Sequence, residues 1–179
     1  MAVSIEIIKE LRELTSASVS DCKKALDDAK GDIKKASELI RQRGLEIATK
    51  KASRAANQGR IEAYVHTGSK IGVMVEINCE TDFVARNEGF IRFCKDIAMQ
   101  VAATDPEALR REDIPAEEIK DLNDAQKEDF FKVRVLLDQP FIKDPKQSIK
   151  DYLTATVAKI GENIVIRRYS RFKLGEDEK

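Results

Sequence analysis

The chain has 179 residues, 42% of them hydrophobic and 36% charged, and its 32 basic and 32 acidic side chains balance. Balanced charge disfavours a dedicated nucleic-acid-binding protein, which needs a basic excess to displace counterions. No apolar run approaches the roughly 18 residues of a membrane span, and the N-terminus lacks the basic and apolar regions of a signal peptide. Three cysteines far apart in sequence, Cys22, Cys79 and Cys94, fit a reducing compartment better than a disulfide scaffold. We therefore expect a cytoplasmic protein without a membrane partner.

The first 45 residues predict three short amphipathic helices, with a polar break between the first two. Ser18 and Asp32 are the predicted N-caps of the second and third helices. Gly31 and Gly44 are predicted to end those helices. A bundle of this size has only a marginally stabilising core. Residues 1–45 are therefore expected to form a three-helix N-terminal module.

Residues 46–59 are predicted to be a basic connector. Large apolar residues are few here, and Lys50, Lys51 and Arg54 make the segment positive. It can continue as an exposed helix until the sequence around Gly59 breaks it.

Residues 60–179 carry the signals of a second, larger domain. Alternating apolar and polar residues predict strands at 60–66 and 70–79, joined by a Thr-Gly-Ser turn. Apolar residues at three- and four-residue spacing then predict a helix over 90–101. Asp105-Pro106 is expected to end that helix.

An acidic stretch follows, since residues 104–129 contain ten acidic and four basic side chains. A helix is expected to begin at Pro115 and run to Leu137, with an interruption near Asp124. The last predicted elements are an irregular loop at 136–144, a helix at 148–159, a turn at 161–163 and a strand at 164–172. Three strands among several helices predict an α+β core, a three-stranded antiparallel sheet packed with helices.

Residues 76–86 form the junction between the second strand and the helix that follows. They read Glu-Ile-Asn-Cys-Glu-Thr-Asp-Phe-Val-Ala-Arg and place a carboxylate, Asp82, beside a large apolar ring, Phe83. Regular structure on both sides leaves such a corner little backbone entropy to lose. The pattern leaves two interpretations open. Either Asp82 caps a helix turn while Phe83 enters the core, or the corner presents both side chains to a partner.

The string at 76–86 resembles the signature of elongation factor Ts, the bacterial and organellar nucleotide-exchange factor for the GTPase elongation factor Tu. Residues 11–26, which read Leu-Arg-Glu-Leu-Thr-Ser-Ala-Ser-Val-Ser-Asp-Cys-Lys-Lys-Ala-Leu, resemble the family's N-terminal signature, and residues 136–144 resemble part of its core. The resemblance implies a ubiquitin-associated-like N-terminal module that docks on the nucleotide-binding domain of elongation factor Tu. Arg12 and Val19 are the contact residues that we expect there. A solvated helix face stays an alternative for Arg12.

In this family a Thr-Asp-Phe-Val motif presses into the GTPase domain and disturbs its Mg²⁺ site. Carried over, the motif falls on Thr81, Asp82, Phe83 and Val84. We expect Phe83 to act as a wedge and Asp82 to perturb magnesium and switch contacts. Thr81 and Val84 are expected to hold the turn.

The number of core units bears on the oligomeric state. Longer members of the family carry two tandem copies of the sheet-containing core, whereas this sequence has one strand–strand–helix unit and no internal repeat. Short members form homodimers, so the resemblance implies a homodimer.

Residues suited to catalysis are sparse. The single histidine, His66, lies in a predicted strand, and no set of His, Cys or carboxylate residues has metal-ligand spacing. The sequence has no Gly-x-x-x-x-Gly-Lys loop for nucleotide phosphates. We therefore expect a binding protein rather than an enzyme, with no cofactor, no metal and no direct nucleic-acid partner.

Two other function classes remain beside nucleotide exchange. The first is an adaptor, in which the module binds a peptide or a ubiquitin-like surface and the core only dimerises. The second is an RNA-binding translation accessory, based on the cations of the connector and on Arg167 and Arg168. The connector has no aromatic residue to stack a base, which weakens this second alternative.

Overall fold

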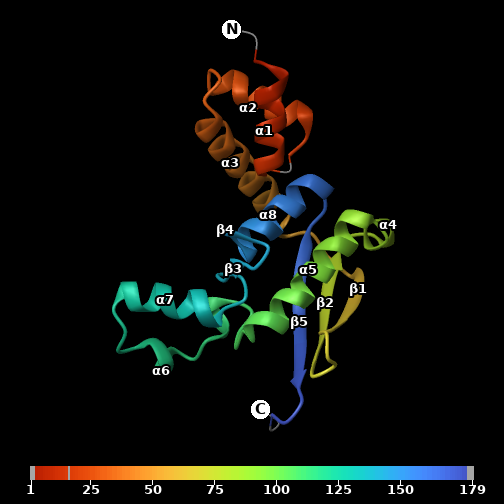
Figure 1. Cartoon of the computed structure of the whole chain (residues 1–179), viewed down its shortest axis with the longest axis vertical. Helices are drawn as coiled ribbons and strands as arrows, with labels where there is room; N and C mark the ends of the chain where they lie inside the picture. Colours follow the sequence, from red (N-terminus) through yellow and green to blue (C-terminus); the bar gives the residue numbers. More distant parts are fainter. Residues whose placement is uncertain (1–2, 16, 177–179) are drawn as a thin grey trace.

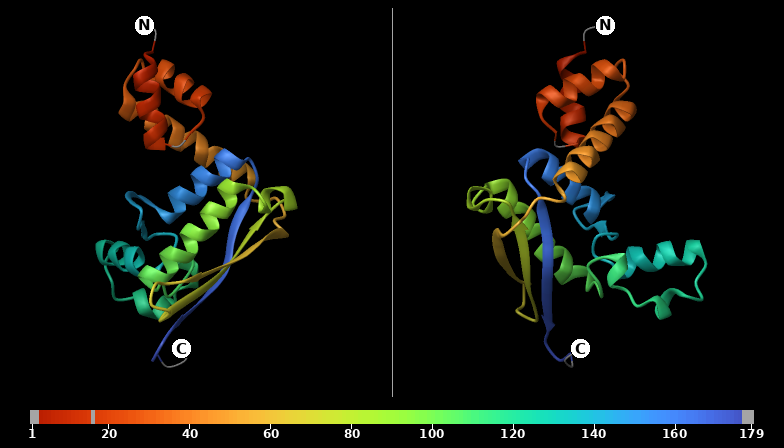
Figure 2. Two further views of the ribbon diagram at one scale, coloured as in Figure 1. Left: turned by 45° about the vertical axis from the view of Figure 1, so that its right-hand side comes forward. Right: turned by 180° about the vertical axis from the view of Figure 1, so that it is seen from behind.

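Figures 1 and 2 show an elongated molecule with three parts: a helical module at the N-terminal end, a sheet with helices in the middle, and a helical lobe that projects to one side. The computed structural model describes residues 3–15 and 17–176. Ser16, in the predicted polar break, lies outside the described residues, as do the first two residues of the chain, on which the signal-peptide prediction partly rests. The predicted α+β fold is confirmed.

The N-terminal module consists of α1 (Ile5–Thr15), α2 (Val19–Asp28) and α3 (Ile33–Lys51). Both predicted N-caps are confirmed. Ser18 Oγ accepts a hydrogen bond from the Asp21 amide at 3.1 Å, and Asp32 Oδ1 accepts one from the Lys35 amide at 3.1 Å. These bonds satisfy amides that the first helical turn leaves without partners. The buried core of the module consists of Leu11, Cys22, Ala25, Leu26, Ala29 and Ala36.

The third helix continues through Gly44 to Lys51, so the prediction that Gly44 ends it is wrong. Gly44 is buried where α3 packs on α8 (Ile149–Ile160), and a Cβ there would lie 3.7 Å from Ala158 Cβ. Lys51 Nζ also donates to the Gly161 carbonyl at 2.5 Å. Glycine often ends a helix. Here contacts with α8, which is distant in sequence, stabilise the part of α3 that follows Gly44. The helix α3 crosses the predicted boundary between the N-terminal module (1–45) and the connector (46–59). The division of the chain into module, connector and core domain (60–179) stays a prediction.

Three antiparallel strands form the central sheet, in the order β1–β2–β5. They are β1 (Gln58–Val65), β2 (Ile71–Cys79) and β5 (Ile164–Lys173). The pairing of β2 with β5 shifts register between Glu76 and Ile77, shortly before β2 enters the junction. Gly59 has a φ of +152°, and a Cβ there would lie 2.3 Å from the Ile77 carbonyl oxygen. Glycine is therefore required where these two strands approach each other.

One face of the sheet is covered by α5 (Glu88–Thr104), as Figures 1 and 2 show. Val73, Val75 and Ile77 of β2 point into this layer and are buried. The six apolar positions predicted for the helix are all fully buried: Phe90, Phe93, Cys94, Ile97, Ala98 and Val101. The main hydrophobic core therefore lies between α5 and the sheet.

The opposite face of the sheet is open to solvent. The predicted alternation of apolar and polar residues is present in β1. Its polar side faces the core, where Glu62 is buried and Tyr64 is partly buried, and its apolar side faces solvent. The strand register places four apolar side chains together on the solvent side, each between 51% and 69% exposed. We call this surface the open face; its residues are Ile61, Val65, Met74 and Phe172.

The helix expected between Pro115 and Leu137 is two helices, α6 (Ala116–Ile119) and α7 (Asp124–Arg134). The predicted interruption near Asp124 is confirmed, but the helix ends at Arg134. Together with a 3₁₀ turn, η1 (Arg111–Asp113), these helices form the projecting lobe of Figure 1. The lobe has a small buried core of its own, formed by Ala108, Ile114, Phe131 and Val135.

The predicted irregular loop contains a short hairpin of β3 (Pro140–Phe141) and β4 (Asp144–Ser148). Distant elements hold it in place. The Phe141 ring stacks on Tyr152 of α8 with centroids 4.7 Å apart, and Gln100 Oε1 of α5 accepts from the Ile142 amide at 2.9 Å. Local sequence patterns do not contain such contacts. The predicted last helix and last strand are confirmed as α8 and β5.

Candidate functional site

A one-turn helix, α4 (Asp82–Ala85), joins β2 to α5 and carries three residues of the predicted motif, Asp82, Phe83 and Val84. Thr81 is its N-cap, because Thr81 Oγ1 accepts from the Val84 amide at 3.3 Å. Asn87 then caps α5 by accepting from the Gly89 amide at 2.8 Å, and a Cβ at Gly89 would approach Asn87 Oδ1 to 3.0 Å. Two successive N-caps therefore fix where α4 and α5 begin. We call residues 81–86 the knuckle.

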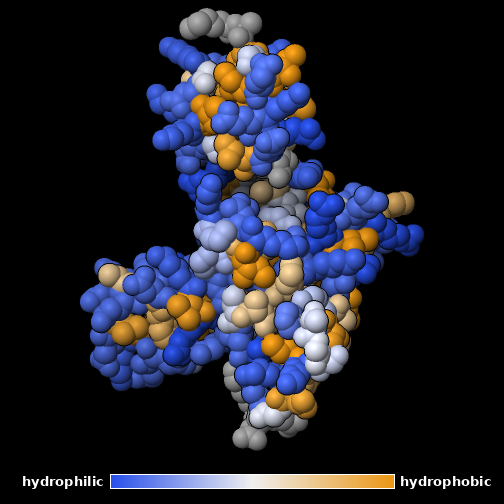
Figure 3. Space-filling model, viewed as in Figure 1, coloured by the Kyte–Doolittle hydropathy of each residue, from blue (hydrophilic) through white to orange (hydrophobic). Residues whose placement is uncertain are grey.

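Phe83 is 82% exposed, more than any other large hydrophobic residue in the described part of the chain. The interpretation that places this ring in the core is therefore wrong, and the cap of the turn is Thr81 rather than Asp82. Figure 3 shows a mostly hydrophilic surface where α4 projects. Burial of a Phe side chain is worth about 1.5–3 kcal/mol, and here that free energy is still available to a second protein.

Asp82 pairs with Arg86 one turn later on the knuckle. Asp82 Oδ2 accepts from Arg86 Nη2 at 3.0 Å, and the two side chains are 50% and 80% exposed. A pair this exposed contributes little to stability. A cationic group on another protein can therefore replace Arg86 beside the Asp82 carboxylate with little loss.

A turn distant in sequence holds the start of the knuckle. Glu162 Oε2 accepts from the amides of Glu80 at 3.1 Å and Thr81 at 3.0 Å. Glu162 Oε1 accepts from Thr81 Oγ1 at 2.7 Å. In return, Glu80 Oε1 accepts from the Asn163 amide at 2.6 Å. We call these four residues the carboxylate clasp.

The clasp was missed from the sequence, which indicates only a turn at 161–163. Thr81 and Glu162 are 81 positions apart, and periodicity gives no information on a contact of that separation. The local signal is an acidic residue between Gly161 and Asn163 in a turn, and many exposed turns share it.

Cys79 lies directly behind the knuckle, and its Sγ donates to the Thr81 carbonyl at 3.1 Å. Burial, reinforced by the nearby Glu162 carboxylate, raises the pKa of Cys79 to about 11. Burial also raises the pKa of Cys94 to about 12. All three cysteines are free and buried, as expected of a chain without a disulfide scaffold, and none of these thiols reaches the surface to link a second subunit.

Both predicted contact residues of the N-terminal module are exposed. Arg12 lies in the last turn of α1, and Val19 is the first residue of α2 and 55% exposed. Arg12 borders an open hollow shared with Lys159 of α8, at the side of the module that meets the core. Both side chains are therefore accessible, and their role in binding stays a prediction.

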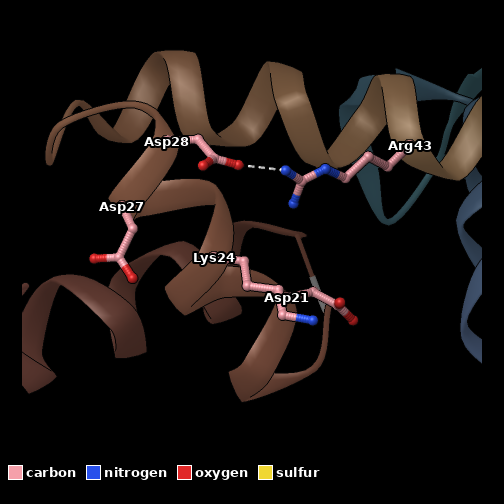
Figure 4. Close-up of a pocket in the computed structure, with 5 residues that line it drawn as sticks. All are labelled: Asp21, Lys24, Asp27, Asp28 and Arg43. Carbon is pink, nitrogen blue, oxygen red and sulfur yellow. Dashed lines mark hydrogen bonds and ion pairs between the residues drawn. The ribbon is translucent and has the colours of Figure 1, made fainter.

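A second hollow of the module lies between α2 and α3 and is shown in Figure 4. Arg43 Nη2 donates to Asp28 Oδ2 at 2.5 Å, which links the two helices. The lining is entirely charged and contains neither Arg12 nor Val19: it consists of Asp21, Lys24, Asp27, Asp28 and Arg43. This hollow is an ion-paired seam between helices.

Among the described residues, no three His, Cys, Asp or Glu side chains are placed to hold a metal ion. His66 is exposed just after β1, with its Nδ1 3.0 Å from the Tyr64 hydroxyl. The helices of the described segments also include none that is long and apolar enough to cross a bilayer.

Known proteins match this chain over almost its whole length. A family model described as elongation factor TS matches residues 2–132. Elongation factor Ts of Carboxydothermus hydrogenoformans is 51% identical over 97% of this chain and 90% of that protein. Elongation factor Ts of Thermodesulfovibrio yellowstonii is 48% identical over 99% of each chain. The chain belongs to the elongation factor Ts family. It is therefore a translation elongation factor, with a role in protein biosynthesis.

The family match encloses part of the site. Residues 2–132 include Arg12, Val19 and the whole knuckle, whereas Glu162 and Asn163 of the clasp lie beyond them. The alignments cover between 90% and 99% of these two elongation factor Ts relatives, so they have little length left for a second copy of the core.

Proposed function

We propose that this elongation factor Ts family member is a guanine nucleotide exchange factor, which binds GDP-loaded elongation factor Tu and promotes GDP release through the knuckle. The observation that carries the proposal is the Phe83 ring, 82% exposed on a corner whose ends are both capped, within the family's signature string. The protein would act by binding rather than by a covalent reaction. We place it in the cytoplasm, where translation takes place.

The free energy needed to expel GDP indicates whether the knuckle can act alone or needs other surfaces of the protein. A GTPase holds GDP through backbone amides and through Mg²⁺ bridging to the phosphates. A partner expels GDP when it binds the nucleotide-free state better than the loaded one. A 10⁴-fold faster release requires roughly 5.5 kcal/mol of such preference, and burial of one Phe supplies about 2–3 kcal/mol. Other surfaces must supply the rest, and the exposed Arg12 and Val19 of the N-terminal module are our candidates.

Each residue of the knuckle has a proposed part in the exchange. Phe83 is the wedge that enters the GTPase. Asp82 exchanges its exposed partner Arg86 for groups near the bound Mg²⁺, which disturbs the metal and switch contacts. Thr81 and Val84 hold the turn through the capping hydrogen bond at 3.3 Å.

Stopped-flow release of a fluorescent GDP from elongation factor Tu tests the proposal. The unmodified protein should accelerate release by orders of magnitude. Phe83→Ala should lose about 30-fold of that acceleration, the equivalent of roughly 2 kcal/mol. Val133→Ala is the matched control, because Val133 is 68% exposed on α7 of the lobe. Equal release rates for the two variants would remove Phe83 from the mechanism.

The same assay separates the other function classes. An adaptor would bind elongation factor Tu or another protein without accelerating GDP release. An RNA-binding accessory would show an RNA affinity that falls steeply with salt, whereas a log-affinity against log-salt slope near zero removes that class.

We also propose that the protein is a homodimer in which two copies appose their open faces. The support is the surface itself: Met74 and Phe172 are 51% and 69% exposed on a sheet whose other side packs against α5. A Glu76–Arg168 ion pair at 2.7 Å borders these apolar residues, as a polar rim borders the apolar centre of many interfaces. Two sheets packed face to face would bury both sets of apolar residues.

Molar mass in solution, measured by light scattering, tests the dimer. Phe172→Glu would bury an unpaired charge in the interface and should convert the dimer to a monomer. Val133→Glu is the control, because it introduces the same charge on the lobe. A monomeric unmodified protein, or a Phe172→Glu variant that stays dimeric, contradicts this arrangement.

A further inference from the structure

The knuckle depends on its anchorage because α4 has only four residues, all of them at least partly exposed. A single helical turn is not stable by itself. The direction in which Phe83 points is therefore set by the contacts of its neighbours. Val84 and Ala85 pack against the main core. Thr81, at the start of the turn, is both the N-cap of α4 and a member of the carboxylate clasp.

Glu162 holds the start of the turn from a distant part of the chain. Its carboxylate accepts three hydrogen bonds, two from the amides of Glu80 and Thr81 and one from the Thr81 hydroxyl, at distances from 2.7 to 3.1 Å. The hydroxyl donates to Glu162 and can therefore still accept from the Val84 amide, which is the capping bond. Bonds to an ionised carboxylate are stronger than bonds between neutral groups.

The turn that carries Glu162 is itself fixed to two other segments. The Asn163 side-chain amide donates to the carbonyl of Arg54 at 2.8 Å and to that of Ala52 at 3.4 Å, at the end of the α3 segment. The Asn163 backbone amide donates to Glu80 at 2.6 Å. Glu162 therefore reaches the knuckle from a rigid base, which is what a positioning contact requires.

We infer that Glu162 is a positioning residue for nucleotide exchange: it touches no partner but orients Phe83 and Asp82 by holding Thr81. This inference rests on the proposed exchange function. A misplacement of about 1 Å in a group that must fit a transition state can lower a rate by up to about 100-fold. Loss of the Glu162 contacts should therefore lower the rate of GDP release at saturation, while the surfaces that provide affinity stay in place.

Glu162→Gln tests this with little change in shape, because the amide offers one acceptor oxygen where the carboxylate offers two. The maximal rate of GDP release from elongation factor Tu should fall about 10- to 100-fold. The concentration that gives half-maximal release should change by less than about threefold, since affinity comes mainly from other surfaces. Glu128→Gln is the control. Glu128 accepts two short hydrogen bonds from Arg111 in the lobe, one at each carboxylate oxygen, and loses one acceptor oxygen in the same way. This variant should leave both values unchanged.

A double-mutant cycle separates positioning from general destabilisation. Because Glu162 acts through Phe83 as well as Asp82, Glu162→Gln should cause a clearly smaller loss when it is added to Phe83→Ala than in the unmodified protein. A loss of equal size in both backgrounds, or a loss no larger than that of Glu128→Gln, overturns the inference while leaving the exchange function intact.

Amide hydrogen exchange gives a readout that does not depend on the GTPase. In Glu162→Gln the amides of Glu80 and Thr81 should exchange at least about tenfold faster, while those of α5 keep their protection. Unchanged protection of these two amides also overturns the inference. If the unmodified protein fails to accelerate GDP release, the proposed function and this inference fall together.

Discussion

Replacing Phe83 by Ala should leave the stability of the fold almost unchanged, whereas replacing Phe93 should not. Phe83 is 82% exposed, so less than a fifth of its surface is shielded by its own chain. At about 3 kcal/mol for complete burial, the loss in the free energy of unfolding is about 0.5 kcal/mol. Phe93 is fully buried and packs against Tyr152 with ring centroids 5.1 Å apart. Its truncation leaves a cavity and should cost about 3–5 kcal/mol.

Urea unfolding followed by circular dichroism, at one fixed protein concentration, measures both values. The fixed concentration matters because stability depends on protein concentration if the chain dimerises. A loss above about 1.5 kcal/mol for Phe83→Ala would mean that the ring supports its own fold. In that case its exposure would not identify a residue kept for a partner.

Three further predictions concern the fold around the site. Gly59→Ala should cost more than about 2 kcal/mol, because the new Cβ would meet the Ile77 carbonyl oxygen at 2.3 Å. Gly68→Ala should cost only about 1 kcal/mol in the same urea titration, since its φ is +89° but its surroundings are open, and equal losses would contradict this reasoning. The free energy of unfolding should be constant from about pH 6 to pH 8 and fall from there toward pH 11, because burial raises the pKa of Cys79 to about 11 and that of Tyr169 to about 12. Thiols and phenols of the unfolded chain lose their protons at lower pH than these buried groups, so rising pH favours the unfolded state. A urea midpoint that stays level from about pH 8 to pH 11 would refute this prediction. The three buried thiols should react with a maleimide slowly in native buffer and quickly in urea, and rapid native labelling would show that they are accessible.

Sequence patterns predicted the elements whose stability is mainly local. The spacing of Phe90, Phe93 and Ile97 identified the buried side of α5, because a helix face against a sheet repeats every three or four residues. Ser18 and Asp32 identified two helix starts, because a cap depends on residues three positions apart. The candidate site was predicted from the string at 81–84, and its role in partner binding stays a prediction.

Features that depend on distant contacts were not predictable in this way. Gly44 lies within a helix because α8 packs against it, and the β3–β4 hairpin forms because Tyr152 and Gln100 hold it. The open face carries Ile61 and Val65 on the exposed side of a strand, which alternation alone cannot assign to solvent or core. The clasp joins turns that no local pattern relates.

The most direct measurement of the central claim is the affinity of this protein for elongation factor Tu in two states, nucleotide-free and loaded with GDP and Mg²⁺, by titration calorimetry. Binding of this protein and binding of GDP to elongation factor Tu are linked. If this protein weakens the affinity for GDP by a given factor, it must bind the nucleotide-free form more tightly than the GDP-loaded form by the same factor. A preference of roughly 5.5 kcal/mol corresponds to a factor of about 10⁴. We predict a difference of that order, and a clear reduction of it in Phe83→Ala. Equal affinities for the two forms would contradict the account, because a partner that binds both states equally cannot shift the equilibrium between them.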